Sequence, residues 1–157
     1  MIRPRCTAIF DEPKSFLTAA KQRLAYRDVP MQFRGKALVV DDNVALARVT
    51  QFALGRAGLD AHIAPNGRKA LELALAEKYD IVISDQQMPE MTGLELCRRL
   101  RSTAEYAATP IVLLTAKGLE LELPALQREL EISAIFSKPF SPSEVVGAAC
   151  QLLGATV

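Results

Sequence analysis

The stretch Ile81-Val82-Ile83-Ser84 runs directly into Asp85, and this short β-rich run with a carboxylate at its end decides how the chain folds. Four similar runs occur, at residues 37–40, 61–64, 111–114 and 134–136. All except 61–64 are continuously apolar, which predicts strands covered on both faces, whereas 61–64 is shorter and typical of an edge. The sequence therefore predicts five strands.

A helical pattern follows each of these strands. The segments expected to be helical are Val44 to Arg56, Gly67 to Lys78, Gly93 to Thr103, Leu119 to Glu131 and a last one that opens with Ser141-Pro142-Ser143-Glu144. Gly58 can end the first helix and Asn66 can cap the second, while the last opens with a capping box and a proline at its first position. Pro124 is tolerated only in a first turn, so the start of the fourth helix stays open.

The alternation of strands and helices predicts an α/β fold. Five such units with short strands indicate a doubly wound (βα)5 parallel sheet, for which the flavodoxin-like strand order is the commonest at this size. In such sheets ligands bind outside the carboxyl ends of the strands. The residues at those ends are therefore the candidates for function.

The composition is that of an ordinary globular protein. The 157 residues are 50% hydrophobic and 24% charged, and 19 basic and 18 acidic residues give a net charge of +1. This balance excludes disorder throughout and provides no overall attraction to nucleic acid or anionic membrane. No apolar run is long enough to cross a bilayer, and no secretory segment opens the chain, so we expect a cytoplasmic protein. Cys6, Cys97 and Cys150 are odd in number and far apart, which predicts reduced thiols.

The first 34 residues differ from the rest in charge. They carry seven Lys or Arg and three Asp or Glu, a net +4, which leaves −3 for residues 35–157. We therefore expect an N-terminal extension over residues 1–34 with one helix, followed by one domain over residues 35–157. The helix would run from about Pro13 to Arg27, and we hypothesise that it docks on the domain or on a second copy. Its apolar stripe would consist of Phe16, Leu17, Ala20 and Leu24.

Charged and polar side chains follow four of the predicted strands. Asp41 and Asp42 follow the first strand along the chain, Asp85 the third, Thr115 the fourth and Lys138 the fifth. Three carboxylates at one sheet edge need a cation among them, and all-oxygen ligation favours a hard ion such as Mg²⁺. A carboxylate beside Mg²⁺ can attack phosphorus while an ammonium and a hydroxyl bind the transferring group. Asp85, Lys138 and Thr115 suit these roles.

A nucleotide or flavin site is disfavoured at this edge. Such a site would place a Gly-rich or Ser/Thr-rich loop after the first strand, with amides facing phosphate, and the Asp41-Asp42 pair would repel it. Taken singly, each candidate has a plainer explanation as a solvated charge, a helix cap or a loop hydroxyl. The coincidence of all of them at strand ends favours one site.

These motifs resemble the receiver domain, the phospho-acceptor module of two-component response regulators. The resemblance covers residues 36 to about 153, and Thr115 stands 30 residues after Asp85, as the family places its switch hydroxyl. It also predicts that the Lys138-Pro139 peptide bond is cis. The matching segments are Val39-Val40-Asp41-Asp42-Asn43, Asp85-Gln86-Gln87-Met88-Pro89-Glu90-Met91-Thr92-Gly93, Thr115-Ala116 and Lys138-Pro139-Phe140.

The resemblance implies a role for each acidic residue. Asp85 would be the residue that is phosphorylated. Asp42, Asp85 and the backbone carbonyl of Gln87 would bind Mg²⁺ directly, and Asp41 would act through water. Lys138 would pair with the phosphoryl group.

The resemblance also implies how the protein signals. It would be a single-domain response regulator that takes a phosphoryl group from a sensor histidine kinase or a histidine phosphotransfer protein. It would catalyse its own phosphorylation and slow dephosphorylation by water, without being an enzyme acting on other substrates. Thr115 would then move inward and shift a face made by helix 119–131, strand 134–136 and the last helix, where a downstream protein binds. Because the sequence ends directly after that helix, we expect no direct DNA binding, and we expect no membrane partner.

Two positions depart from the family pattern. Ile135 stands where the family has Tyr or Phe, and the aromatic Phe136 comes one residue later. Because side chains alternate along a strand, we expect Phe136 to point to the opposite face and Ile135 to be unable to act as an aromatic switch. Gln87 and Lys117 occupy positions that in the family flank the phosphoryl group and influence its lifetime, which these residue types do not fix.

Two alternative functions stay open. A pseudo-receiver would keep the fold as a docking module without phosphorylation. The intact acids, threonine and lysine argue against it, whereas Ile135 leaves it open. An aspartyl-phosphate phosphatase of the haloacid dehalogenase type needs a second Asp two residues after the first, where Gln87 cannot protonate a leaving group.

Two further features are expected to be structural. His62 is the only histidine, and the sequence places no ligand near it. The cluster of Arg98, Arg99 and Arg101 is most simply a solvated helix face, although it could meet an acidic partner.

Overall fold

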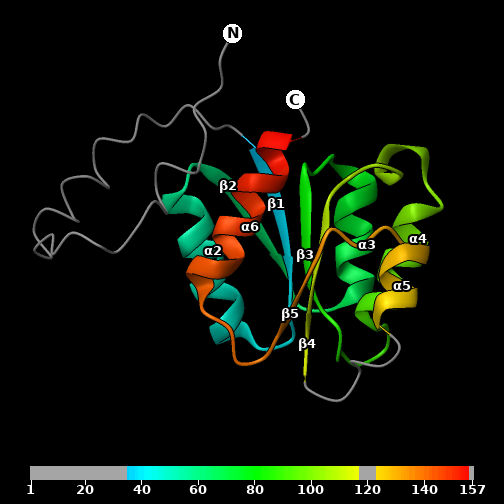
Figure 1. Ribbon diagram of the computed structural model, residues 1–157, viewed down its shortest axis with the longest axis horizontal. Helices are drawn as coiled ribbons and strands as arrows, with labels where there is room; N and C mark the ends of the chain where they lie inside the picture. Colours follow the sequence, from blue (N-terminus) through cyan, green and yellow to red (C-terminus); the bar gives the residue numbers. More distant parts are fainter. Residues whose placement is uncertain (1–34, 117–122, 156–157) are drawn as a thin grey trace, which may run out of the picture.

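The computed structural model describes residues 35–116 and 123–155, which form a five-stranded parallel sheet with helices on both faces (Figure 1). The strand order is β2-β1-β3-β4-β5, so the predicted doubly wound α/β fold is confirmed. The predicted N-terminal extension and its helix lie outside the described residues. The elements are β1 (Gly35–Val40), α2 (Val44–Arg56), β2 (Leu59–Ala64), α3 (Gly67–Ala76), β3 (Ile81–Asp85), α4 (Gly93–Arg101), the 3-10 helix η2 (Ala104–Tyr106), β4 (Ile111–Thr115), α5 (Leu123–Glu129), β5 (Ala134–Ser137) and α6 (Pro142–Ala155).

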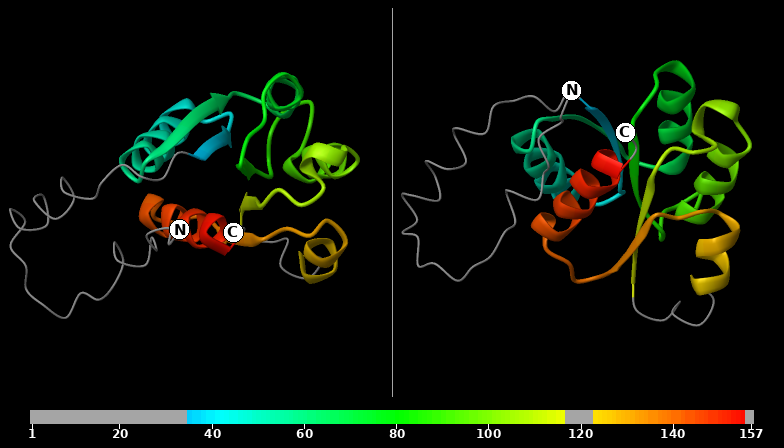
Figure 2. Two further views of the ribbon diagram at one scale, coloured as in Figure 1. Left: turned by 90° about the horizontal axis from the view of Figure 1, so that it is seen from above. Right: turned by 45° about the horizontal axis from the view of Figure 1, so that its top comes forward.

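Two apolar layers fasten the helices to the sheet. Helices α2 and α6 cover one face, and α3, α4 and α5 cover the other (Figure 1, Figure 2). Alternation along β1 separates the layers, because Val39 packs with the α2 and α6 side while Leu38 and Val40 pack with the opposite side. Strands β3 and β4 are buried along their whole length. Each fully buried Val, Leu or Ile side chain contributes roughly 1.5–3 kcal/mol to folding.

Strands β2 and β5 form the two edges of the sheet. The edge position predicted for β2 is confirmed, but the strand has six residues, as many as β1, so the expectation of a shorter strand is wrong. The prediction that residues 134–136 are covered on both faces is also wrong, since these residues of β5 are only half-buried. The local sequence is as apolar as that of a central strand, and only the topology places β5 at an edge.

Local capping signals set the starts of the helices largely as predicted. The side chain of Asn66 accepts from the Lys69 N–H at 2.8 Å, which caps α3. The predicted capping box before α6 is present, since Glu144 donates its N–H to the Ser141 hydroxyl at 3.2 Å and its carboxylate accepts from the Ser141 N–H at 2.8 Å. Helix α5 begins at Leu123, so Pro124 lies in the first turn, where its missing N–H costs no hydrogen bond.

The ends of three helices come earlier than predicted. Helix α3 ends at Ala76, α4 at Arg101 and α5 at Glu129, each two residues before the expected end. The chain after α4 forms the tighter η2 turn instead of a further α-helical turn. Gly58 follows α2 with a φ of 92°, a left-handed conformation that glycine adopts without strain, so the predicted end of that helix is confirmed.

Three further predictions can be compared with the structure. The Lys138-Pro139 peptide bond is cis, as predicted. Cys97 and Cys150 are free and buried, also as predicted, and burial raises the pKa of Cys97 to about 11; Cys6 lies outside the described residues. Among the residues that the structure describes, no helix has the length and apolar character needed to cross a bilayer.

Candidate functional site

Three carboxylates meet at the carboxyl end of the sheet. Strands β1 and β3 are neighbours with Val40 opposite Ser84, so the residues that follow Val40 lie beside the end of β3. Asp41, Asp42 and Asp85 each offer one oxygen, and these three oxygens lie within 4.8 Å of one another. Asp41 and Asp85 are buried, with 1% and 2% of their surface exposed, whereas Asp42 is exposed. The predicted cluster of acids is therefore assembled.

Lys138 reaches this cluster from the loop that follows the edge strand β5. Its Nζ lies 3.0 Å from Asp85 Oδ1. Its backbone N–H donates to the Thr115 carbonyl at 2.8 Å, which fixes the start of the loop after β5 to the end of β4. Among residues 35–116 and 123–155, one ammonium thus faces three carboxylates, which leaves an excess of negative charge on this part of the cluster.

The arrangement is unfavourable for Asp41, because one of its carboxylate oxygens is buried without a hydrogen bond in the described part of the chain. Its Oδ1 accepts from the Asn43 N–H at 2.8 Å, but its Oδ2 is buried without a hydrogen-bond partner among residues 35–116 and 123–155. Burial raises the pKa of Asp41 above its usual value, and the Asn43 N–H and the Lys138 ammonium oppose this shift only in part. An orphaned carboxylate oxygen beside two further carboxylates fits a hard divalent cation with oxygen ligands, such as Mg²⁺.

The other predicted site residues lie around this cluster. Thr115 ends β4 as a buried residue, and its hydroxyl donates to the carbonyl of Ala116 at 3.1 Å. Gln87 lies exposed, two residues after Asp85. Lys117 falls outside the described residues. Asp41, Asp42, Asp85 and Lys138 are therefore brought into direct proximity, while the Thr115 hydroxyl bonds locally.

The altered aromatic position has the predicted consequence for side-chain direction. Ile135 packs against the apolar layer on the α3, α4 and α5 side of the sheet. Phe136 packs against the layer on the α2 and α6 side. The shift of the aromatic by one residue therefore moves its ring to the opposite face, as expected from the alternation of side chains in a strand.

Two residues next to the site shape the start of α4, and the structural role of one of them, Gln86, was not predicted from the sequence. Gln86 is buried directly after Asp85, and its side chain accepts from the Leu94 N–H at 2.8 Å in the first turn of α4. Gly93 is packed so closely that a Cβ atom there would lie 2.4 Å from the Asp85 carbonyl oxygen. The polar side chain next to Asp85 was the only available signal for Gln86.

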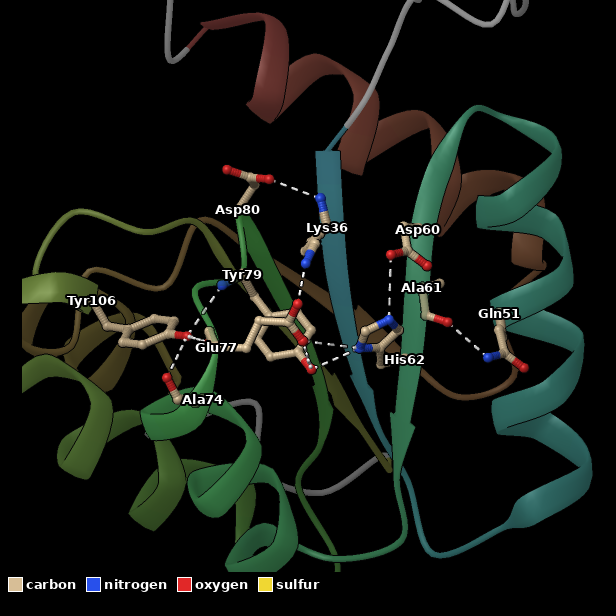
Figure 3. A network of polar contacts seen from close by, with 10 residues as sticks. All are labelled: Lys36, Gln51, Asp60, Ala61, His62, Ala74, Glu77, Tyr79, Asp80 and Tyr106. Carbon is tan, nitrogen blue, oxygen red and sulfur yellow. Dashed lines mark hydrogen bonds and ion pairs between the residues drawn. The ribbon is translucent and has the colours of Figure 1, made fainter.

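A second polar cluster lies toward the amino end of the sheet (Figure 3). His62 Nε2 lies 3.3 Å from Asp60 Oδ2, and its Nδ1 lies 2.8 Å from the Tyr79 hydroxyl and 3.6 Å from Glu77 Oε2. Glu77 also pairs with Lys36. The expectation that nothing surrounds His62 is therefore wrong, because residues distant in sequence converge on it.

The expectation of a solvated arginine face is wrong for one of its three members. Arg98 and Arg99 are exposed, but Arg101 is half-buried. Its guanidinium donates to four backbone carbonyls, those of Tyr106, Thr109, Leu130 and Glu131, at 2.5, 2.8, 2.8 and 2.9 Å. Arg101 therefore joins the end of α4 to the η2 segment and to the end of α5.

Comparisons with known proteins agree with this geometry. Residues 37–149 match the family described as the response regulator receiver domain. The chain is 39% identical over 110 residues to the alkaline phosphatase synthesis transcriptional regulatory protein PhoP of Bacillus subtilis, covering 70% of this chain and 45% of that protein. It is 38% identical over 109 residues to the transcriptional regulatory protein SrrA of Staphylococcus aureus, covering 69% and 44%. The chain thus spans less than half the length of these curated relatives.

Solved structures give the same result. The chemotaxis response regulator CheY4 of Vibrio cholerae superposes with a TM-score of 0.71 at 29% identity, covering 76% of this chain and 99% of that one. The receiver domain of the Francisella response regulator 1452 superposes with a TM-score of 0.70 at 28% identity, covering 78% and 99%.

Proposed function

The chain belongs to the response regulator receiver domain family, and from that premise we propose that it accepts a phosphoryl group on Asp85 in a Mg²⁺-dependent reaction. The donor is the phosphohistidine of a sensor histidine kinase or of a histidine phosphotransfer protein. The product is an aspartyl phosphate that changes which protein the domain binds.

One observation carries this proposal. Asp85 lies at the centre of the acid cluster, with Lys138 Nζ 3.0 Å from its Oδ1 and oxygens of Asp41 and Asp42 within 4.8 Å. A structural ion pair would need only the lysine. The two additional carboxylates raise the electrostatic cost of the site without pairing, which favours a site that receives a cation and a transferred group.

The chemistry assigns a task to each side chain. Asp85 attacks phosphorus with one carboxylate oxygen while the bond to the donor nitrogen breaks and the imidazole leaves. A cation held by Asp41, Asp42, Asp85 and the Gln87 carbonyl would offset negative charge on the phosphoryl oxygens. Lys138 leaves its ion pair with Asp85 and binds a phosphoryl oxygen, and the Thr115 hydroxyl rotates toward another. Attack of water later releases inorganic phosphate and restores Asp85.

The proposed output is a protein contact on the face made by α5, β5 and α6. Thr115 ends β4 beside β5, where it pairs with Ser137, so movement of its hydroxyl is felt first at that edge. The two curated relatives are transcriptional regulatory proteins by name. We propose that residues 35–157 contact a protein target and not DNA, because they carry a net charge of −3, which is repelled by the phosphate groups of DNA.

The experiment that tests the proposal is intact-mass measurement after incubation with acetyl phosphate, with and without Mg²⁺. The wild type is expected to gain one phosphoryl group only with Mg²⁺, and Asp85→Asn is expected to gain none. Asp60→Asn serves as the matched control, because it removes an exposed carboxylate at the other end of the sheet. An adduct on Asp85→Asn, or none on the wild type, contradicts the proposal.

Ile135 favours one second candidate, a docking module that does not depend on phosphorylation. With Phe136 turned to the α2 and α6 side, β5 presents no aromatic ring to follow the movement of Thr115. In that case a partner captured by the wild type would bind Asp85→Asn equally well, with or without acetyl phosphate. A binding change that requires Asp85 would exclude this candidate.

A further inference from the structure

Gln86 extends the acceptor strand by one residue. It follows Asp85 directly and is buried, with 8% of its surface exposed. Its backbone N–H donates to the Leu114 carbonyl at 2.8 Å, which continues the pairing of β3 with β4. The backbone of Gln86 is therefore fixed to the sheet, and its side chain can form a hydrogen bond outside the sheet.

That side chain holds the start of α4. The Gln86 carbonyl accepts from the Gly93 N–H at 3.0 Å, and its Oε1 accepts from the Leu94 N–H at 2.8 Å. Both are among the N–H groups that a helix leaves without partners in its first turn. One residue thus closes both ends of the loop that runs from the acceptor strand to α4.

We propose that Gln86 is a positioning residue for the cation site: its side-chain amide holds residues 87–92 in the shape that presents the Gln87 carbonyl beside Asp85. The inference rests on the proposed function, which gives that carbonyl to Mg²⁺. Asp41, Asp42 and Asp85 are held by the ends of strands or lie next to them, but Gln87 lies in the loop between β3 and α4. Its position therefore depends on how the loop is fastened.

The expected effect of removing the Gln86 side-chain amide follows from the hydrogen bond that is lost with it. Without Oε1, the Leu94 N–H loses its acceptor, and the loop stays fastened to residue 86 only through the bond from Gly93. A looser loop must be ordered when the cation binds, and the cost of ordering is subtracted from the binding free energy. The loss falls on cation affinity and not on the phosphoryl transfer that follows binding.

The test compares two substitutions at this position in the full chain. Gln86→Met keeps the length of the side chain without an acceptor oxygen, whereas Gln86→Glu keeps the acceptor. Thr103→Val is the matched control, because it removes one side-chain hydrogen bond at the other end of α4, from the Thr103 hydroxyl to the Leu100 carbonyl at 2.7 Å. Three quantities are measured: Mg²⁺ affinity by calorimetric titration, amide exchange at Leu94 by NMR, and the initial rate with acetyl phosphate at saturating Mg²⁺.

Gln86→Met is expected to bind Mg²⁺ about fivefold more weakly and to exchange the Leu94 amide at least about tenfold faster, with little change in the rate at saturating Mg²⁺. Gln86→Glu is expected to bind Mg²⁺ no more weakly than the wild type, and Thr103→Val to bind it equally well. Unchanged affinity in a folded Gln86→Met protein, or an equal loss in Thr103→Val, overturns the inference.

Failure of the proposed function is distinguishable from failure of this inference. A wild type that binds Mg²⁺ but takes up no phosphoryl group contradicts the proposed function, while the Mg²⁺ titrations still decide the role of Gln86. A wild type that binds no Mg²⁺ overturns both.

Discussion

Charged side chains gather at both ends of the sheet, but they are satisfied in different ways. Toward the amino end, Lys36 pairs with Glu77, and His62 lies between Asp60 and the Tyr79 hydroxyl (Figure 3). At the carboxyl end, within the described part of the chain, three carboxylates face one lysine and the buried Asp41 Oδ2 has no hydrogen-bond partner.

The difference separates charges that stabilise the fold from charges that prepare a reaction. A buried charge without a partner lowers stability, and proteins retain such strain where a ligand or a reaction uses it. A network in which each group has a partner gives no such indication. Charge clusters of similar composition can therefore be distinguished by whether their hydrogen bonds are complete.

The largest effect is expected from Arg101→Met at the amino end, where α4 and α5 terminate. The substitution removes a half-buried guanidinium that donates to four backbone carbonyls in two segments, at η2 and after α5. Hydrogen bonds from charged donors are strong, and the carbonyls would lose their partners. We expect the free energy of unfolding to fall by about 3 kcal/mol, measured by urea unfolding.

Arg98→Met provides the matched control for this substitution, since Arg98 is exposed on the same helix. It is expected to change the free energy of unfolding by no more than about 0.5 kcal/mol. Equal effects of the two substitutions would mean that the stability of the amino end does not depend on Arg101. The claim that charged groups at this end stabilise the fold would then be contradicted.

The contacts of Arg101 and His62 show what could not be predicted from the sequence. The acids were located from the sequence, because each follows an apolar run whose end can be recognised and parallel strands bring these ends together. Arg101 bonds to the Leu130 carbonyl, 29 residues away, and His62 to Tyr79, 17 residues away. Backbone carbonyls carry no residue-specific signal, and the spacing between His62 and Tyr79 follows no local pattern. Neither contact could therefore be inferred before the packing was known.

The same reasoning accounts for the errors at the edge of the sheet. Residues 134–136 have the composition of a covered strand, yet β5 is half-buried because no further strand pairs beyond it in the described sheet. By contrast, the caps of α3 and α6 depend on residues three positions apart and were predicted correctly. Local hydrogen bonds are visible in sequence, whereas neighbours in the sheet are set by the whole fold.

Asp41→Asn, at the carboxyl end of the sheet, is expected to raise the free energy of unfolding, whereas Arg101→Met lowers it. The amide keeps an acceptor for the Asn43 N–H and removes a buried charge whose second oxygen has no partner in the described residues. Without divalent cations, we expect the free energy of unfolding to rise by about 1 kcal/mol in urea unfolding. Mg²⁺ should narrow the difference, because binding stabilises the wild type more than the variant.

The pH dependence of this gain has a definite sign. Burial raises the pKa of Asp41 above its usual 3.8, so the folded protein holds this proton more tightly than the unfolded chain does. The wild type therefore loses stability as pH rises from that value through the raised pKa. The advantage of Asp41→Asn should grow as pH rises above 3.8 and vanish in acid. A variant less stable than the wild type at neutral pH would mean that the charge of Asp41 is already compensated.

The smallest effect is expected from Glu77→Gln at the amino end, which weakens the pair with Lys36. Both side chains are about two-fifths exposed, at 39% and 41%, and ion pairs of this kind contribute little and are screened by salt. We expect a loss of stability at neutral pH that is smaller than the gain from Asp41→Asn and that shrinks in high salt. Urea unfolding at low and high salt measures it.

The pH dependence of this loss has the opposite cause to that of Asp41→Asn, because the pKa of Glu77 is lowered whereas the pKa of Asp41 is raised. The hydrogen bond from Lys36 is the main reason that the pKa of Glu77 lies below its usual 4.5. A carboxylate with a lowered pKa adds stability above its unfolded pKa and loses it as pH falls through the folded pKa. Glu77→Gln should therefore be less stable than the wild type at neutral pH and equal to it in acid. Asp41→Asn should be more stable than the wild type at neutral pH and should also equal it in acid. If both substitutions shifted stability in the same direction, the two ends of the sheet would not differ as their hydrogen bonds indicate.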